Sequence, residues 1–224
     1  MSVALVTLVT SPAFQTLADS TLPSHRVYAR RLGADHVVLK EFAFPHPHYD
    51  KWQLVRLFDR YERIIYIDAD AIVRRDCPDL FVMVPPEHVG GENELRTYPS
   101  QAQHLAAFAA RFGITDLNCP FYVNAGVIVA SACHRELFRP PEKIFTDLPW
   151  PEQTHFNFRL LTENVPVCLM PSIFNDRHRE GEYLRRSFIL HYSCMSNEDR
   201  IAAARRDLAA WDVLFRHAGH SSSV

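Results

Sequence analysis

The chain has 224 residues, a length that suits one domain with a sizeable core. Its formal net charge is -2, from 24 basic and 26 acidic residues, and this balance argues against a nucleic-acid-binding protein. Five scattered cysteines with no Cys-x-x-Cys pair indicate neither a disulfide framework nor a zinc site, so a cytoplasmic location is the default expectation.

The N-terminal segment has the pattern of a nucleotide-binding unit. Residues 3–10 are apolar, lack a basic flank and are too short to cross a bilayer, so they predict a first, central strand. A helix within 14–32 and a strand at 34–39 complete a βαβ unit. After a proline-rich aromatic loop at 42–49, helical spacing over 51–61 predicts the helix that leads to the next strand.

Residues 63–73 form an apolar run that is interrupted by Asp68 and Asp70, and the rest of the chain is interpreted around it. Open α/β sheets bind ligands beyond the carboxyl ends of their strands, and period-two alternation places both carboxylates on one side. Like charges this close repel, and a hard cation such as Mn²⁺ or Mg²⁺ is the usual remedy, which suits the binding of a diphosphate. Alternatively, the two acids cap a helix or pair with Arg74 and Arg75.

A second interrupted run lies further along the chain. Residues 84–92 predict a turn, a short strand and a Gly-Gly loop, and residues 101–112 predict an amphipathic helix. The strand predicted at 121–129 contains residues that weaken strands, and close approach of a ligand would explain them: Asn124, Ala125 and Gly126. A bulge with a buried asparagine is the alternative.

The C-terminal third predicts two short strands between two helices. A helix opens near Pro151, a strand follows at 165–171, and the strand at 187–192 ends in a histidine, His191. The last helix, 197–217, has one apolar side, which indicates packing on the sheet or on another subunit. Docking to a membrane surface is the alternative for that helix.

The segment from Tyr66 to Phe81 resembles the Asp-x-Asp segment of GT-A glycosyltransferases, most closely the glycogenin-like and lipopolysaccharide galactosyltransferase group. The resemblance implies a single α/β domain over 1–224, with a Rossmann-like, mixed and mostly parallel sheet flanked by helices. It also implies three parts: a nucleotide-binding half at 1–80, a donor-sugar and acceptor half at 81–195, and a C-terminal helix and tail at 196–224.

The resemblance also implies roles for individual residues. Lys51 would reach the phosphates or the first carboxylate, and Asn124 would bind donor-sugar hydroxyls. The family's Asp-Gln-Asp-x-x-Asn segment is matched by Glu152, Gln153 and Asn157, with a Glu for the first Asp that leaves the donor sugar open. The implied catalytic residues are Asp70, Glu152 and Gln153; the implied metal ligands are Asp68, Asp70 and His191; the implied donor-binding residues are Thr10, Lys51, Asp68, Ala69, Asn124, Ala125, Gly126, Glu152, Gln153 and Asn175.

The chain departs from the family after His191. The family's Lys-Pro-Trp is missing, and the chain reads Ser-Cys-Met-Ser at 193–196. The basic stretch at 176–186 is either a solvated face or a phosphate-binding segment, so the candidates for replacing the missing lysine are Arg177, Arg179 and Arg185.

The expected function is therefore metal-dependent transfer of a hexose-type sugar, with retention of configuration, from a nucleotide diphosphate sugar such as a UDP-sugar. The acceptor would be a glycan, a lipid-linked molecule or a protein. Three alternatives remain: a non-catalytic sugar-nucleotide-binding protein, a HAD-like phosphohydrolase, and a nucleotidylyltransferase. The phosphohydrolase normally has its acids on the first strand, and the nucleotidylyltransferase needs a glycine-rich loop where this chain has Thr10 to Ala13.

Overall fold

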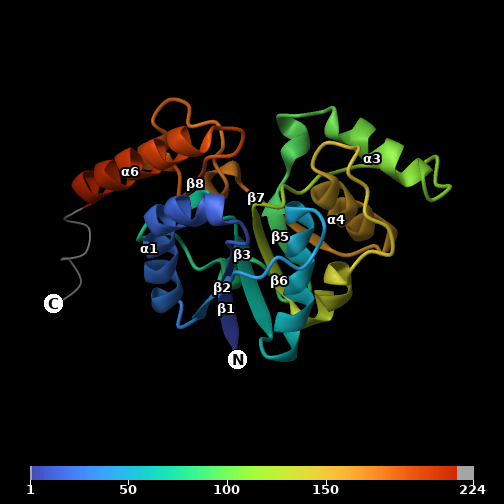
Figure 1. Cartoon of the computed structure of the whole chain (residues 1–224), viewed down its shortest axis with the longest axis horizontal. Coiled ribbons are helices and arrows are strands. Elements are labelled where there is room, and N and C mark those ends of the chain that lie inside the picture. Colours follow the sequence, from blue (N-terminus) through green and yellow to red (C-terminus); the bar gives the residue numbers. More distant parts are fainter. Residues whose placement is uncertain (1, 216–224) are drawn as a thin grey trace.

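The computed structural model describes residues 2–215, and its centre is a six-stranded sheet in the order β2-β1-β3-β6-β5-β7 (Figure 1). Only β6 runs antiparallel to its neighbours, so the sheet is mixed and mostly parallel, as predicted. The strands are β1 (Val3–Leu8), β2 (Asp35–Leu39), β3 (Arg63–Ile67), β5 (Val89–Glu92), β6 (Val127–Ser131) and β7 (Val167–Met170).

A separate two-stranded antiparallel sheet pairs β4 (Ala71–Val73) with β8 (Ile189–His191). The apolar run at 63–73 is therefore divided between two sheets. The Ala71 amide donates to the Asp68 carbonyl at 3.1 Å, which makes a turn of the residues between β3 and β4. Strand alternation was predicted to place both carboxylates on one side. That prediction was wrong, because Asp68 and Asp70 lie in the turn between β3 and β4 and not in a strand.

Helices cover the sheet in two groups (Figure 1). One group packs α1 against α6 beside the small sheet, and the other packs α3 against α4 near β5 and β7. The α-helices are α1 (Gln15–Arg31), α2 (Leu80–Met83), α3 (Gln101–Ala110), α4 (Pro151–Thr162), α5 (Tyr183–Arg186) and α6 (Asn197–Leu214). The 3₁₀ helices are η1 (Pro12–Phe14), η2 (Pro47–Asp59), η3 (Glu94–Arg96), η4 (Ala132–Phe138) and η5 (Ser172–Phe174).

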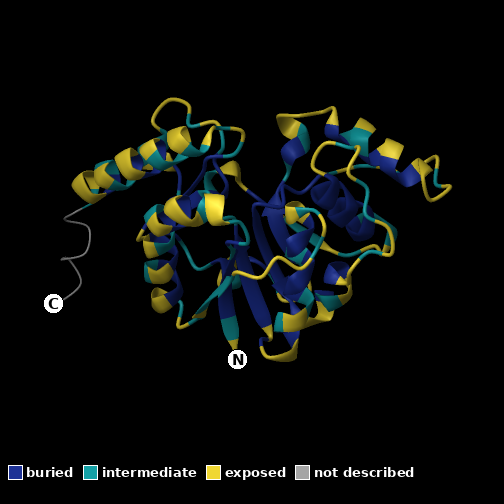
Figure 2. Cartoon of the chain, in the orientation of Figure 1, coloured by how far each residue is buried: buried dark blue, intermediate teal, exposed yellow. Residues whose placement is uncertain are grey.

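The core follows from the sequence of the central strands. Every residue of β3 and β6 is buried, because both strands carry β-branched and aromatic side chains on both faces and helices cover those faces (Figure 2). The predicted helices at 14–32, 101–112 and from Pro151 are confirmed, although the second ends at Ala110. The segment predicted as helical at 51–61 lies in the 3₁₀ helix η2 up to Asp59. The last helix is confirmed to Leu214, and the end predicted at 217 lies outside the described residues.

Two predictions about glycine were wrong. Gly90 and Gly91 lie inside β5 rather than in a loop, and a Cβ on them would come within 2.5 Å and 2.3 Å of the side chains of Val84 and Val123. Gly126 lies before β6 rather than inside a strand. Tight packing of backbone against side chains, which sequence periodicity does not reveal, explains these glycines.

The five cysteines are unpaired thiols, in agreement with the absence of a disulfide framework from the sequence pattern. Within residues 2–215, no helix combines the length and the apolar character that crossing a bilayer requires.

Candidate functional site

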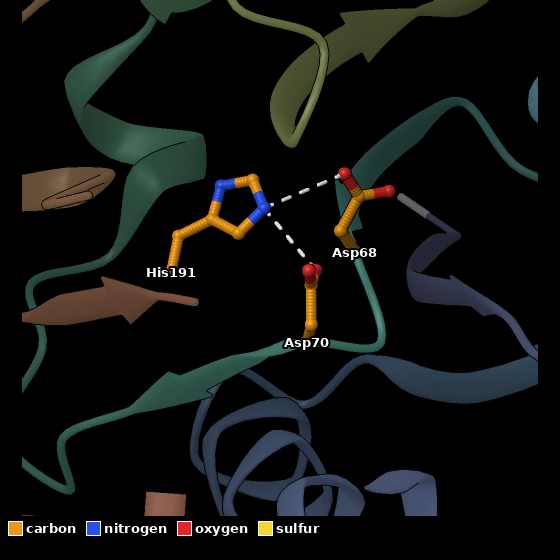
Figure 3. Close-up of side chains that lie close together, drawn as sticks. All are labelled: Asp68, Asp70 and His191. Carbon is orange, nitrogen blue, oxygen red and sulfur yellow. Dashed lines mark ion pairs between the residues drawn. The ribbon is translucent and has the colours of Figure 1, made fainter. Parts of the chain in front are cut away.

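The site is built on the turn between β3 and β4. Asp68 and Asp70 leave this turn, and the antiparallel pairing of β4 with β8 places Ala71 opposite His191. The Nε2 atom of His191 lies 3.1 Å from an Asp70 oxygen and 3.8 Å from an Asp68 oxygen (Figure 3). The structure therefore brings together the three residues that the sequence predicted as metal ligands.

The orientation of the His191 ring is fixed by an amide. Asn175 donates its two Nδ2 hydrogens to Oε2 of Glu92 and to the side-chain oxygen Oδ1 of Asn124, each at 2.9 Å. Its own side-chain oxygen, Oδ1, therefore faces His191. That oxygen lies 2.8 Å from Nδ1 of His191 and can only accept, so Nδ1 carries the hydrogen. The other ring nitrogen, Nε2, then points at two carboxylates.

This donor set fits a divalent cation. A lone pair that faces two carboxylates is repulsive unless a proton or a metal ion lies between them, and a histidine held through its other nitrogen is typical of metal ligands. The nitrogen and the two carboxylate oxygens lie within 4.8 Å of one another. One imidazole with two carboxylates suits Mn²⁺, and Mg²⁺ is a harder alternative.

Gly126 makes room for the imidazole. A Cβ at this position would lie 2.3 Å from Cε1 and 2.7 Å from Nδ1 of His191. The carbonyl of Gly126 accepts from the Asp68 amide at 2.8 Å, so the same residue holds the acidic turn in place. The sequence analysis explained Gly126 by the close approach of a ligand. In the structure, the His191 side chain approaches Gly126 closely and requires a glycine there.

Lys51 lies on the other side of Asp68. Its Nζ is 3.4 Å from Asp68 and 3.4 Å from Glu152, and it lies over the ring of Tyr66. Burial alone would lower the pKa of Lys51, but the two carboxylates outweigh it and raise the pKa. The Tyr66 hydroxyl also donates to Asp68. Lys51 thus reaches the first carboxylate, one of the two positions predicted for it.

Asp70 has a second cationic neighbour. Arg200, from α6, places Nη1 3.4 Å from Oδ2 of Asp70, the oxygen that does not face His191. Burial favours the neutral carboxyl, but His191 and Arg200 outweigh it and hold the pKa of Asp70 below its usual range. The sequence analysis did not find Arg200, which lies on the polar side of an amphipathic helix.

Glu152 opens α4 and is held between two basic side chains. Lys51 lies 3.4 Å from one of its oxygens, and His48 Nδ1 lies 3.3 Å from the other. Burial would raise the pKa of Glu152, but these neighbours lower it to about 2. A carboxylate this acidic is a weak general base near neutral pH.

Behind the acidic turn lies a buried network of amides and carboxylates. The Gln153 oxygen accepts from Asn124 Nδ2 at 3.1 Å and from the Ala125 amide at 2.9 Å, and its Nε2 donates to Glu94 at 2.6 Å. Asn124 closes this network towards the metal ligands, because its oxygen accepts from Asn175 and from the Gly126 amide. Of the predicted donor-sugar residues, Asn124, Gln153 and Asn175 therefore form one hydrogen-bonded unit, whereas Glu152 contacts Lys51 and His48.

Arg177 neutralises the acids of this network. It pairs with Glu94, and its Nε lies 3.6 Å from Glu92. All three side chains are almost fully buried, and burial raises the pKa of Glu92 in spite of Arg177. The sequence analysis assigned no role to Glu92, at the end of the predicted Gly-Gly loop, or to Glu94, which follows that segment.

The other predicted residues surround these groups. Thr10 follows β1 at the same edge of the sheet as Asp68, since β1 and β3 are parallel and in register. The Ala69 carbonyl accepts from the Thr21 hydroxyl at 2.6 Å. Asn157 exchanges two hydrogen bonds with the backbone of Val123, which fixes α4 against the site.

The candidates for replacing the missing lysine lie elsewhere in the structure. Arg177 is committed to Glu92 and Glu94, and Arg179 donates to the His191 carbonyl at 2.9 Å. Arg185 lies on α5, where its carbonyl accepts from Arg74. Within residues 2–215, the cations that pair with Asp68 or Asp70 are Lys51 and Arg200, besides His191.

Solved structures with the same fold are glycosyltransferases. A glycosyltransferase involved in glycosylation of the major capsid of PBCV-1 is 12% identical, with a TM-score of 0.61 over 92% of this chain and 100% of its own. The bifunctional glycosyltransferase WbbM is 15% identical, with a TM-score of 0.59 over 94% of this chain and 51% of its own. The glycosyltransferase GlyE of Streptococcus pneumoniae TIGR4 is 14% identical, with a TM-score of 0.56 over 100% of this chain and 66% of its own.

These likenesses establish the fold, which is that of the GT-A glycosyltransferases, and do not distinguish the glycogenin-like subtype. No protein-family model and no curated protein matches the sequence. The chain spans about half of WbbM and about two thirds of GlyE, so activity, substrates and partners must be argued from the site itself.

Proposed function

We propose that this chain is a metal-dependent glycosyltransferase that moves a hexose-type sugar from a nucleotide diphosphate sugar, such as a UDP-sugar, to an acceptor hydroxyl. The single observation that carries the proposal is the position of His191, whose Nε2 lies 3.1 Å from Asp70 and 3.8 Å from Asp68 inside a GT-A fold. Mn²⁺ or Mg²⁺ bound by these three residues would act as a Lewis acid on the leaving diphosphate.

The buried network supports a donor-sugar position beside the metal ligands. Asn124, Gln153 and Asn175 are locked by hydrogen bonds to one another and to buried acids, which gives the rigid first layer that sugar binding requires. In this proposal the nucleotide base lies near Thr10 in the half formed by residues 1–80. The sugar and the acceptor lie in the half formed by 81–195.

The carboxylates of Glu152 and Asp176 are poor general bases, and this supports retention of configuration. An inverting transferase needs a base to remove the acceptor proton, and the pKa of Glu152, about 2, makes it a weak one. Asp176, whose carbonyl accepts from the His191 amide, has an occupied carboxylate as well, because it accepts from the Ser187 hydroxyl and from the amides of His178 and Arg179. The departing phosphate oxygen would then take the acceptor proton.

The acceptor, a glycan, a lipid-linked molecule or a protein, stays a prediction, as does a cytoplasmic location. A membrane contact through α6 also stays a prediction. A non-catalytic protein that only binds sugar nucleotides is the second candidate, because it would have the same fold and donor site. Hydrolysis or transfer of the donor sugar separates the two, since only an enzyme turns the donor over.

The test is a thermal-shift screen of UDP-, GDP- and TDP-sugars with and without Mn²⁺. A ligand that binds the native state raises the melting temperature by mass action, and at 100 times its Kd it adds about 2.7 kcal/mol. We expect a Mn²⁺-dependent shift that is lost in Asp70→Asn and kept in Asp212→Asn, a matched change at an exposed aspartate of α6. A shift that survives in Asp70→Asn would remove the metal from the proposal.

A further inference from the structure

The C-terminal helix α6 is tied to the first helical segment of the chain next to the acidic turn. Its first residue, Asn197, donates to the Ala13 carbonyl at 3.4 Å, and Arg205 donates to the Ser20 hydroxyl at 3.2 Å. Ser196 caps the helix by accepting from the Asp199 amide at 3.1 Å. Arg200 is the fourth residue of this helix and lies in its first turn.

Arg200 is held beside Asp70 with unused hydrogen-bonding capacity. Its Nη1 lies 3.4 Å from Asp70, and its side chain is 17% exposed. Its Nε is buried and has no hydrogen-bond partner among residues 2–215. An arginine has five N–H donors, and a buried donor without a partner is costly, so this guanidinium can gain from an additional acceptor.

The other basic side chains near the site are enclosed by acids. Lys51 is shared between Asp68 and Glu152, and Arg177, whose Nε and Nη2 also lack hydrogen-bond partners among residues 2–215, is 7% exposed between two buried acids. Arg200 is more exposed, lies over the ring of Phe14, and forms one ion pair, to a carboxylate that a divalent cation would use. When a metal ion takes up the negative charge of Asp70, the attraction between Asp70 and Arg200 weakens, and the guanidinium needs another anion.

We propose that Arg200 is an exchangeable counter-cation. It pairs with Asp70 while the metal is absent, and it moves to the phosphate oxygens of a diphosphate once the metal is bound. This inference rests on the proposed function, because it takes the metal and the diphosphate from there. A guanidinium suits the second partner, because its planar fork matches phosphate oxygens in a bidentate geometry.

The exchange predicts that removing Arg200 has different effects on the affinity for Mn²⁺ and on the affinity for a diphosphate. Without a nucleotide, Arg200 competes with the metal for Asp70, so its removal leaves Mn²⁺ affinity unchanged or makes it a few-fold tighter. With a diphosphate, Arg200 supplies a charge-assisted hydrogen bond, so its removal weakens binding by about 10- to 100-fold. A residue that only holds α6 in place would weaken both.

The experiment measures binding of Mn²⁺ alone, and of UDP, UMP and inorganic pyrophosphate in the presence of Mn²⁺, by titration calorimetry. The variants are Arg200→Ala and Arg200→Lys, and the matched control is Arg75→Ala, an exposed arginine that pairs with Asp212 of the same helix. We expect Arg200→Ala to weaken binding of UDP and pyrophosphate but of UMP much less. Arg200→Lys should recover part of the loss, and Arg75→Ala should bind all ligands as the native chain does.

The outcomes separate this inference from the proposed function. If the native chain binds neither Mn²⁺ nor UDP, the proposed function and the role of Arg200 both fail. If the native chain binds both and Arg200→Ala binds UDP equally well, only the role of Arg200 fails. A loss of Mn²⁺ affinity in Arg200→Ala alone, or an equal loss for UMP and UDP, would also contradict the exchange.

Discussion

The two parts of the candidate site satisfy their charges in different ways. In the buried network, Glu92 and Glu94 are compensated by Arg177 and by the amides of Gln153 and Asn175. In the acidic turn, the compensation is incomplete. The Nε2 atom of His191 faces both carboxylates, and Lys51 and Arg200 each lie 3.4 Å from one of them.

This difference indicates that the buried network and the acidic turn have different roles. A network whose members satisfy one another is rigid, and its organisation does not depend on a ligand. A cluster with excess negative charge is stabilised by a cation from solution, so its organisation depends on the ion. We therefore expect substitutions in the network to reduce stability first, and substitutions in the turn to reduce metal and nucleotide binding first.

Arg177→Met should give the largest loss of stability. It leaves Glu92 and Glu94 buried without their cation, and breaking a buried ion pair in this way costs about 3–5 kcal/mol. Urea unfolding measures the loss. Arg60→Met is the matched control, because Arg60 forms an exposed pair with Asp35, and pairs of that kind contribute about 0–1 kcal/mol.

Urea unfolding also tests whether uncompensated buried acids cause the loss of stability. Adding Glu94→Gln to Arg177→Met removes one uncompensated charge and should recover part of the stability. A loss in Arg177→Met as small as that in the Arg60→Met control would show that the network does not depend on its arginine.

Gly126→Ala should reduce both stability and Mn²⁺ affinity, with a smaller loss of stability than in Arg177→Met. The added Cβ would overlap the His191 ring and come within 2.9 Å of the Asn124 oxygen, so one of them must move. Overpacking of this kind costs about 1–3 kcal/mol. Mn²⁺ affinity should also fall, because the imidazole is displaced from the two aspartates. Unchanged affinity for Mn²⁺, measured by calorimetry, would contradict the predicted position of the ring.

His48→Gln should give the smallest effect, visible as a change with pH. The hydrogen bond and the charge of Glu152 raise the pKa of His48 above its ordinary value of 6.5. A raised pKa stabilises the folded state below pH 6.5, and this contribution is lost as pH rises through the folded pKa. Because His48 is half exposed, we expect less than about 1 kcal/mol.

The difference in unfolding free energy between the native chain and His48→Gln should therefore be larger at pH 5.5 than at pH 9. Urea unfolding at the two pH values measures it. An equal difference at both would mean that His48 acts through packing rather than through charge.

The sequence carried enough information for the helices, the sheet and the three clustered ligands, because those depend on periodicity and on short motifs. It did not reveal the compensating charges. Arg177 belongs to a basic stretch and Arg200 to the polar side of a helix, and local sequence does not distinguish an arginine that faces solvent from one that is folded inward. Likewise, the glycines of β5 reflect tight packing against Val84 and Val123, which lie on other segments.

The pairing of β4 with β8 also bears on how the protein matures. Ala71 and its partner His191 are far apart in the sequence. Contacts between such distant segments form slowly, because a long intervening loop must first close. A polypeptide that is still on the ribosome before β8 emerges has both aspartates but lacks the imidazole, so the three predicted ligands can meet only after residue 191 has been made.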